Sequence, residues 1–508
     1  MFYPLQQEFL NLTAQGNLIP VYKEILADLE TPVSTYYKIA QKAKYSFLLE
    51  SVEGEEKIAR FSFLARNPEL IFQTKRKKAE LIRFQTGKAH KTSIEIKDNP
   101  LPLIRQILKP YKFVNIPGLP RFCGGMVGFF GYDVVRFFER LASAPVDDLK
   151  IPDILLVLVK ELIIFYHVNH KMKIVHCVSV DADSTRDKKI LAYQKASKSI
   201  DGLITEIQKP LNLKITKKIV PSTPKLKVRS NLTQNQFEKI VEKAKEEIRS
   251  GEIIQVVLSQ RFSVNLKIDP LYVYRMLRAV NPSPYMYYLN FDDIKIVGSS
   301  PELLVRCEDG LVETRPIAGT RPRGRDDKED AKLAIDLLND PKEKAEHVML
   351  VDLGRNDLGR VCEQGTVKLS EFMKIEKYSH VMHIVSNVKG TLQKDKDDFD
   401  VLQAAFPAGT VSGAPKIRAM EIIDRLENVA RGPYAGCIGY FSFSGNLDSC
   451  ITIRTIVITK GKAYIQAGAG IVADSDPYKE YQETVNKAKA QLTAIELAMT
   501  NDGAVYGT

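Results

Sequence analysis

Paired cysteines are absent from this sequence of 508 residues. Its six cysteines occur singly, and no two of them have Cys-x-x-Cys spacing. This usage argues against the common structural zinc sites and against the disulfide framework of small secreted proteins. It suits a reducing compartment, so we expect a cytoplasmic protein.

Long apolar runs are also missing. The longest, ILLVLV at 154–159, ends at Lys160, whereas a membrane-spanning helix needs roughly 20 apolar residues. The N-terminal stretch MFYPLQQEFLNLTAQG has neither the basic start and apolar core of a signal peptide nor the composition of a transit peptide. We therefore expect no association with a membrane.

The positive charge of the chain is not concentrated in one tract. The 73 basic and 62 acidic residues leave a net charge of +11, but the excess lies in short runs such as the four basic residues at 75–78. Zinc-finger spacing, an aromatic-basic RNA signature and a coiled-coil heptad run are all absent. The excess predicts a solvated lysine-rich surface, and we expect no nucleic-acid partner.

A seam rich in Pro, Ser, Thr and Lys divides the chain. We predict an N-terminal domain over 1–210, a linker over 211–232 and a C-terminal domain over 233–499. The N-terminal part mixes strand-like runs, as at 155–166, with glycine turns, as at 123–132. Without a repeat of about 20–50 residues, these patterns predict an α+β protein with large, mostly antiparallel sheets.

Helix boundaries are clearest in the C-terminal part. Thr233 and Gln236 have capping-box spacing, and the helix that they begin is expected to end before Gly251. The β-branched residues at 252–264 predict a strand after it. The final helix is expected to have Asp476 as its N-cap, to begin at Pro477 and to run to about residue 499.

Acidic residues on two predicted helices favour a metal site. Glu346 follows the helix start at Asp340-Pro341, and Glu480, Glu483 and Lys487 share one face of the final helix. Each feature alone is typical of a solvated helix face. Together, two carboxylates on separate helices predict a Mg²⁺ site with positions left for water and an anionic substrate.

Three glycine-containing segments are candidates for anion binding. FPAGTVSGAPKIRAMEII (406–423) is expected to run into a helix at Pro415, where free N–H groups favour anions. IQAGAGIVADSDP (465–477) is expected to form a glycine turn that exposes backbone between a strand and the final helix. TRPIAGTRPRG (314–324) places three arginines around a Gly-Thr turn, which predicts a basic pocket for an acidic ligand.

Two residues are suited to proton transfer. His383 lies in a strand-like apolar run, where it is either a satisfied core histidine or a general base. Glu302 begins an apolar run after a turn, where partial burial would raise its pKa enough for an acid. The residues alone therefore predict a Mg²⁺-assisted enzyme that acts on a small anion with more than one negative group.

Six segments carry a resemblance to a known family over about residues 233–495. They are PIAGTRPRG, AEHVMLVDLGRND, VMHIVS, FPAGTVSGAPKIRAMEII, GYFSFSGNLDSCITIRT and IQAGAGIVADSDPYKEYQET. In this order they closely resemble the chorismate-binding domain of anthranilate synthase component I, and residues 48–51 and 59–68 resemble its N-terminal domain. The resemblance implies sheets packed as a sandwich with helices outside. It also implies conversion of chorismate and ammonia to anthranilate and pyruvate, the first committed step of L-tryptophan biosynthesis.

The resemblance implies roles for single residues. Glu302 matches the acid that protonates the departing C4 hydroxyl as ammonia adds at C2, and His383 matches the base for the loss of pyruvate. Thr410 and Lys487 match supporting active-site contacts. The chorismate contacts that it implies are Gly319, Thr320, Tyr434, Arg454, Gly468, Ala469 and Gly470.

The resemblance also implies a cofactor and an inhibitor. Glu346 and Glu483 match the ligands of Mg²⁺. Feedback inhibition by L-tryptophan is implied, with part of the regulatory site in the N-terminal domain. The residues that match the tryptophan pocket are Glu50, Ser51, Asn281, Pro284, Tyr285, Met286 and Cys450.

Two residues separate rival reactions on this scaffold. Isochorismate synthases carry a Lys where this chain has Gln255, which is no useful base at neutral pH. Aminodeoxychorismate synthases commonly carry a nucleophilic Lys where this chain has Ala318. We therefore expect ammonia itself to attack. Aminodeoxychorismate synthase component I stays the alternative because not all of its members keep that Lys, and a catalytically silent tryptophan-sensing protein is a further one.

The source of ammonia is expected to be a second protein. A glutamine amidotransferase needs a nucleophilic Cys in a glycine-rich elbow and a His-x-Glu, and none of the six cysteines has that setting. Cys437 comes nearest, but it lies within a segment matched to the synthase. We expect a separate amidotransferase subunit, in an αβ pair or a heterotetramer made of two such pairs.

Overall fold

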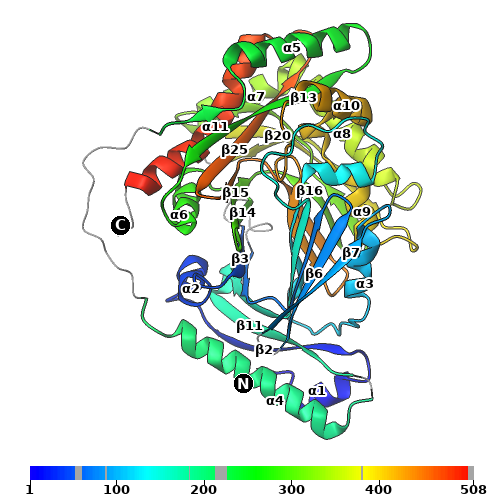
Figure 1. Ribbon diagram of the computed structural model, residues 1–508, viewed down its shortest axis with the longest axis vertical. Coiled ribbons are helices and arrows are strands. Elements are labelled where there is room, and N and C mark those ends of the chain that lie inside the picture. The colour runs from blue at the N-terminus through cyan, green and yellow to red at the C-terminus, as the bar shows by residue number, and fades with distance from the viewer. Residues whose placement is uncertain (52–59, 86–87, 182, 212–225, 379–380, 501–508) are drawn as a thin grey trace.

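The computed structural model describes residues 1–51, 60–85, 88–181, 183–211, 226–378 and 381–500. Two large sheets pack face to face, and helices cover their outer sides (Figure 1). The α+β class and the sandwich of antiparallel sheets are confirmed. In the described part of the chain, no helix is long and apolar enough to cross a membrane.

The first sheet has 13 strands, and Figure 1 shows it curving from β2 to β13. Its strands, in spatial order, are β1 (Phe2–Tyr3), β2 (Leu18–Leu26), β11 (Lys171–Ser179), β10 (Glu161–Tyr166), β4 (Phe61–Arg66), β3 (Tyr45–Glu50), β14 (Tyr285–Phe291), β15 (Ile294–Ser300), β24 (Thr455–Thr459), β25 (Lys462–Ile471), β13 (Gln255–Asn265) and β12 (Arg229–Ser230). The short strand β21 (Gly413–Ala414) also pairs with β13.

The second sheet has 12 strands. Its strands, in spatial order, are β18 (Ile317–Pro322), β20 (Val381–Thr391), β17 (Leu311–Thr314), β16 (Leu303–Glu308), β23 (Leu447–Ile451), β22 (Cys437–Ser442), β8 (Gly125–Phe130), β9 (Ile154–Val159), β5 (Leu70–Lys75), β6 (Lys78–Gln85) and β7 (Lys88–Glu95). Strand β19 (Lys368–Lys377) pairs with β20 at the same end.

The helices divide between the two sheets. Against the first sheet lie α1 (Gln6–Leu12), α2 (Pro32–Ile39), α4 (Arg186–Ile207), α5 (Gln234–Arg249), α6 (Pro270–Val280), α10 (Lys416–Leu426) and α11 (Pro477–Thr500). Against the second lie α7 (Asp327–Asn339), α8 (Pro341–Gly359) and α9 (Asp398–Ala405). The remaining elements are α3 (Leu101–Leu108) and the 3₁₀ turns η1 (Tyr132–Phe137), η2 (His167–Asn169) and η3 (Gly409–Val411).

Alternation along the strands produces the two main cores. In β14, Tyr287 and Leu289 point between the sheets, whereas Met286 and Tyr288 point toward the helices on the outside. Successive side chains of a strand face opposite ways, so a strand covered on both sides must be apolar throughout. This is why β14 consists of apolar and aromatic residues apart from Asn290.

Both sheets include strands from both predicted domains. In the first sheet β3 pairs with β14, and in the second β8 pairs with β22. The sheets therefore continue across the predicted boundary. The division into residues 1–210 and 233–499 stays a prediction, and most of the linker expected at 211–232 lies outside the described residues.

The predicted helix boundaries agree closely with the structure. Thr233 caps α5 through a reciprocal bond with Gln236, as expected. Helix α11 begins at Pro477, and Asp476 accepts a hydrogen bond from the backbone N–H of Lys479 at 2.9 Å. These boundaries depend on local capping chemistry, which short sequence patterns record well.

The predicted glycine turns were wrong at two places, where the structure has strands. Strand β8 occupies most of 123–132, and a Cβ on Gly128 would lie 1.9 Å from the carbonyl oxygen of Leu155 in β9. Gly468 and Gly470 lie inside β25, where a Cβ on Gly468 would lie 2.6 Å from the Tyr434 hydroxyl. Glycine at these positions lets a neighbouring strand or side chain approach the backbone closely within a sheet. The sequence alone does not distinguish this use of glycine from its use in a turn.

Candidate functional site: a proton-transfer cluster and a second cavity

His383 lies in β20, opposite a bulge in β18. The register of this strand pair shifts between Ala318 and Arg321, and Gly319 has a φ of 69° within the bulge. The carbonyl oxygen of Gly319 lies 2.8 Å from His383 Nδ1, and the Thr320 hydroxyl lies 3.1 Å from the same atom. A carbonyl can only accept, so Nδ1 carries the proton and Nε2 keeps its lone pair.

The surroundings of His383 keep its ring neutral. Burial lowers the pKa of His383, and the positive charge of Arg454 lowers it further, although the bond to Gly319 opposes the shift. The imidazole is therefore unprotonated at neutral pH. A neutral ring with a lone pair on Nε2 is the form that a general base requires.

Glu302 lies between β15 and β16 and is buried. Burial raises its pKa to about 8, even though the Thr410 hydroxyl and the Lys487 ammonium group both lower it. Thr410, in η3, lines a small cavity together with Glu302. The carboxyl group is mostly protonated at neutral pH, as a general acid must be.

Helix α11 places charged groups beside β25. Lys487 Nζ pairs with Glu483 at 2.6 Å and donates to the carbonyl oxygen of Gly468 at 3.0 Å. Arg454 donates from Nη1 to the carbonyl oxygen of Lys487 at 2.9 Å. These bonds bring four of the sequence-predicted residues, from three separate segments, into one cluster.

Tyr434 extends this cluster. Its ring is buried, and burial raises the pKa of its hydroxyl to about 12, so the group is protonated at neutral pH. A Cβ on Gly468 would lie 2.6 Å from the Tyr434 hydroxyl oxygen, so the absence of a side chain there makes room for the phenol. Burial lowers the pKa of Arg454, and the negative charge of Glu483 opposes this shift, so the two groups are close enough to interact. A half-buried arginine beside a phenol is suited to holding a carboxylate.

Helix α8 brings Glu346 to the same region. Gln255, at the start of β13, donates from Nε2 to Glu346 at 3.3 Å, and a Cβ on Gly470 would lie 2.5 Å from that nitrogen. Burial raises the pKa of Glu480 in α11, and the charge of Lys342, at the start of α8, opposes this rise. The two predicted metal-binding helices therefore lie near each other.

The carboxylates on these helices repel one another in pairs. Burial and the charge of Glu346 raise the pKa of Glu343. Burial and the charge of Glu483 likewise raise the pKa of Glu480. Within the described residues no three His, Cys, Asp or Glu side chains converge as a ready metal site. Mg²⁺ takes few protein ligands and keeps several waters, so crowded carboxylates fit it as a donor set.

The three arginines of TRPIAGTRPRG are neutralised inside the protein. Each guanidinium group pairs with carboxylates of nearby elements, so the expected basic pocket is wrong for this segment. The pairs are Arg315–Glu376, Arg321–Asp336, Arg321–Asp340 and Arg323–Asp330. Sequence showed the positive charges, but their acidic partners come from α7, β19 and the loops around them.

A separate cavity of about 380 Å³ lies between the two sheets. Six of the seven residues predicted for a tryptophan pocket line it, namely Glu50, Ser51, Pro284, Tyr285, Met286 and Cys450. Asn281 is not among the lining residues and donates instead to the Ser299 hydroxyl at 2.9 Å. Because the lining comes from both predicted domains, this cavity exists only when both are present.

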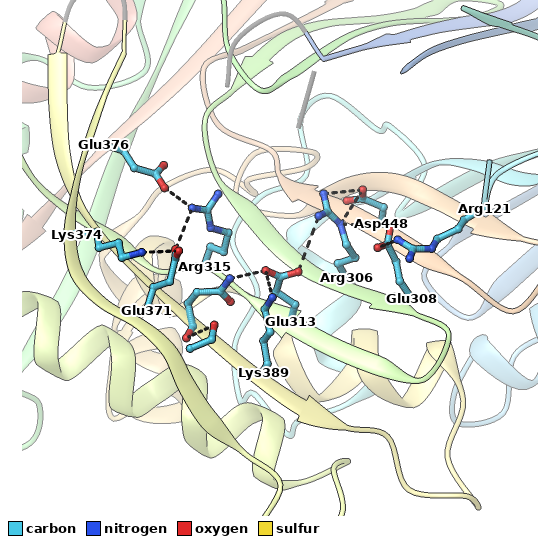
Figure 2. Close-up of polar contacts among 12 residues, drawn as sticks. Arg121, Arg306, Glu308, Glu313, Arg315, Glu371, Lys374, Glu376, Lys389 and Asp448 are labelled. Carbon is cyan, nitrogen blue, oxygen red and sulfur yellow. Dashed lines mark hydrogen bonds and ion pairs between the residues drawn. The ribbon is translucent and has the colours of Figure 1, made fainter. Parts of the chain in front are cut away.

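Charged side chains continue from this cavity along the second sheet (Figure 2). Arg306 pairs with Asp448 at 3.0 Å and donates to the Tyr285 hydroxyl at 3.0 Å. It also lies 3.9 Å from Glu313, which accepts from Asn387 of β20 at 2.6 Å. The cavity wall is therefore tied to the strand that carries His383.

Comparisons with known proteins agree with this arrangement. Residues 44–493 match the family described as chorismate binding enzyme. The chain belongs to this family. It is 50% identical to anthranilate synthase component 1 of Acetivibrio thermocellus, over 98% of this chain and 99% of that protein. It is 49% identical to the protein of the same name from Aquifex aeolicus, over 97% of each.

Solved structures extend the similarity. The crystal structure of anthranilate synthase component I from Streptococcus pneumoniae TIGR4 has a TM-score of 0.72 at 38% identity, covering 92% of this chain and 98% of that one. The menaquinone-specific isochorismate synthase of Escherichia coli shares the fold, with a TM-score of 0.68 at 20% identity, over 96% and 98% of the two chains. Proteins named for different reactions therefore share this fold.

Sequence reasoning missed several residues of these sites. Glu343 lies three residues before Glu346, the same spacing as Glu480 and Glu483, and this repeated spacing was a visible signal. Arg306 and Asp448 line the second cavity from different strands. Nothing local in the sequence indicates that pair, because only strand pairing brings it together.

Proposed function

We propose that this chorismate-binding enzyme is the large subunit of an anthranilate synthase. It converts chorismate and ammonia to anthranilate and pyruvate, the first committed step of L-tryptophan biosynthesis. The observation that carries the proposal is the pair of opposite pKa shifts, since burial keeps Glu302 protonated and His383 unprotonated at neutral pH. Two titratable groups whose pKa values are shifted apart in this way can serve as the acid and the base of one reaction.

In the first step, ammonia adds at C2 of chorismate as the C4 hydroxyl departs. Glu302 donates its proton to that hydroxyl, which leaves as water. Arg454 and the Tyr434 hydroxyl bind a substrate carboxylate, and the backbone of Gly319 and of Gly468 to Gly470 approaches the ring. Two side chains support ammonia as the nucleophile. Ala318 offers no amine that could attack chorismate in place of ammonia, and Gln255 is no base that could activate water.

In the second step, the enolpyruvyl group leaves as pyruvate and the ring becomes aromatic. His383 takes the proton from C2 on Nε2, while Nδ1 stays bonded to Gly319. The departing enolpyruvyl group receives a proton to become pyruvate. Thr410 and Lys487 support this chemistry by contacts around the Glu302 carboxyl.

Magnesium is proposed as the cofactor, held by Glu346 and Glu483. When bound, the cation neutralises a carboxylate of chorismate and holds it in place. The crowding of carboxylates on α8 and α11 supports this assignment, because the paired charges repel each other without a cation.

Ammonia is proposed to come from a glutamine amidotransferase subunit. A nucleophilic thiol needs a lowered pKa. All six cysteines of the chain are buried, and burial raises the pKa of every one. None of them suits glutamine hydrolysis, which supports a partner protein. Unpaired buried thiols also support a cytoplasmic location.

L-Tryptophan is proposed as a feedback inhibitor that binds in the cavity of about 380 Å³. The cavity combines aromatic walls from Phe61 and Tyr440 with the charged groups of Glu50 and Arg306. This mixture suits an amino acid with a large apolar side chain. The buried hydroxyl of Ser51 has no hydrogen-bond partner among the described residues, so a bound amino acid is able to satisfy it.

One assay tests the proposed activity and its alternative. Purified chain is incubated with chorismate, Mg²⁺ and ammonium, and the products are identified by fluorescence and mass. Anthranilate with an equal amount of pyruvate supports anthranilate synthase. An aminated product that keeps its enolpyruvyl group, without pyruvate, indicates aminodeoxychorismate synthase instead. Glutamine replacing ammonium without a partner subunit contradicts the proposed division of labour.

A further inference from the structure

The end of β19 lies beside the imidazole of His383. Glu376 in β19 is the cross-strand partner of His383 in β20. The Tyr378 ring meets the imidazole edge to face, with 5.6 Å between the ring centroids. A T-shaped contact of this kind is favourable and fixes the relative orientation of two rings. His383 is thus bounded by the Gly319 carbonyl on one side and by Tyr378 on another.

Hydrogen bonds with other described residues hold Tyr378 at three points. Its backbone N–H donates to Val381 at 2.8 Å, and its carbonyl oxygen accepts from Arg323 at 2.7 Å. Its hydroxyl donates to Glu376 at 3.0 Å. The backbone and the tip of this side chain are therefore both fixed.

Glu376 is fixed in turn by Arg315. Figure 2 shows the Arg315 guanidinium between Glu376 and Glu371, with the Glu376 pair the closer one. The Arg315 side chain is only 18% exposed, so solvent competes little for this pair. Arg315 and Arg323 lie on either side of the bulge at Gly319. The segment 315–323 therefore supplies the Gly319 carbonyl to the imidazole and also anchors Tyr378, directly through Arg323 and through Glu376 by way of Arg315.

We propose that Tyr378 is a positioning residue for His383, held in place by Glu376, Arg315 and Arg323. The hydrogen bond to Gly319 fixes one ring atom, and the contact with Tyr378 fixes the plane of the ring, which aims Nε2. The arginines act here as structural clamps. The part of this inference that concerns catalysis rests on the proposed function, in which His383 removes a proton in the second step.

The test compares Tyr378→Ala, Tyr378→Phe and the control Lys374→Ala. Lys374 lies on the same strand, is 61% exposed and pairs only with Glu371 at 2.8 Å among the described residues. Chorismate consumption, anthranilate and any aminated intermediate that keeps its enolpyruvyl group are measured with ammonium. We expect Tyr378→Ala to lower kcat for anthranilate by about tenfold or more and to release that intermediate, because a misdirected base slows only the second step. Its KM for chorismate stays within about twofold of the original.

The other two variants sharpen the result. Tyr378→Phe keeps the ring contact and loses the bond to Glu376, so we expect kcat to fall less than about threefold. Lys374→Ala is expected to behave as the unaltered chain. The proposal is overturned if Tyr378→Ala forms anthranilate at the original rate, or if both steps slow together without release of the intermediate.

A second measurement does not depend on turnover. Histidine ¹⁵N NMR reports which ring nitrogen carries the proton, and loss of a signal in His383→Asn assigns it among the seven histidines of the chain. We expect the unaltered chain to show one fixed tautomer at His383, held by the Gly319 carbonyl. In Tyr378→Ala the ring is free to tilt and to break that bond part of the time, so we expect exchange between tautomers. An unchanged spectrum in Tyr378→Ala contradicts the positioning role. If the spectrum changes but the unaltered chain makes no anthranilate, the positioning role stands and the proposed function fails.

Discussion

The Nδ1–H group of His383 donates to the carbonyl oxygen of Gly319 at 2.8 Å. This bond depends on the bulge in β18, because a regular strand has no extra residue to turn its carbonyl toward the neighbouring side chain. Gly319 has a φ of 69° there, in the left-handed region that glycine adopts readily. The tautomer of the proposed base is thus set by the backbone of another strand.

Gly319→Ala is expected to lower both stability and activity. The positive φ costs about 1–2 kcal/mol for any residue with a side chain. The new Cβ would also lie 3.0 Å from Leu337 Cδ1 and 3.1 Å from Glu343 Oε2, so these side chains or the bulge must give way. We expect at least about a tenfold loss of anthranilate formation, since small displacements at a reacting group are costly.

The matched control for this substitution is Gly310→Ala. Gly310 also has a positive φ, 78°, but a Cβ there meets nothing within 4 Å. Urea unfolding should therefore show a similar backbone cost in both variants, with normal turnover only in Gly310→Ala. Equal loss of turnover in the two would mean that the bulge has no special role.

The rate of ammonia addition is expected to depend on a group with a pKa of about 8. Burial raises the pKa of Glu302 to this value, and only the protonated form donates to the leaving hydroxyl. The rate should fall as the pH rises above about 8, after correction for the growing fraction of free ammonia. Single-turnover rates measured across this range, with Glu302→Gln as the inactive reference, check the assignment.

Stability should change with pH through the same carboxyl group. Folding raises the pKa of Glu302 from 4.5 to about 8, so the folded chain binds a proton that the unfolded chain has lost. The contribution is fully present below pH 4.5 and is lost as the pH rises through about 8. We therefore expect the free energy of unfolding, measured with urea, to fall between pH 4.5 and about 8 in the unaltered chain. In Glu302→Gln it should fall less over the same range, by a few kcal/mol. Parallel curves for the two chains would contradict a buried, protonated Glu302.

Local patterns predicted the elements better than the contacts between them. The capping residues Thr233 and Asp476 were found from sequence because their bonds span only three residues. The turns expected at Gly128 and Gly468 were wrong because close approach of another strand also selects glycine. What a glycine faces depends on strand pairing, which no short segment contains.

The arginines of TRPIAGTRPRG illustrate the same limit for charge. Arg315, between β17 and β18, pairs with Glu376 of β19 about 60 residues away along the chain, and β20 lies between these strands. Sequence showed positive charge near a candidate site, and a ligand was the natural partner to expect. The resemblance assigns roles to Glu302, His383 and Arg454 because it transfers positions in a fold and not only residue types. Their roles stay predictions.

Removal of either proposed metal ligand should weaken the dependence on Mg²⁺. We expect Glu346→Gln and Glu483→Gln each to raise the Mg²⁺ concentration for half-maximal activity by at least about tenfold, because an amide oxygen lacks the charge that holds a hard cation. Glu242→Gln is the control, since its side chain is 51% exposed on α5. Magnesium titrations of ammonium-dependent activity give the three values. Unchanged titrations for both ligand variants would place the metal elsewhere.

Binding of L-tryptophan can be followed directly because the chain contains no tryptophan. Emission from the ligand should shift to shorter wavelength when its indole leaves water for the aromatic wall of the cavity. Ser51→Phe fills that cavity, so we expect affinity to fall by at least about tenfold, whereas Ser250→Phe at the exposed end of α5 should leave it unchanged.

Asn281 provides the sharper test of where the inhibitor lies. It was predicted as a contact by resemblance, yet its amide bonds to Ser299 and it does not line the cavity. If the cavity alone defines the site, Asn281→Ala should change the affinity for L-tryptophan by less than about threefold. A change of that size is no larger than the loss of one weak hydrogen bond would cause. A loss as large as that of Ser51→Phe would show that Asn281 turns into the cavity when the ligand binds. The same titrations, repeated as inhibition of anthranilate formation, then tell binding at this cavity apart from its coupling to His383.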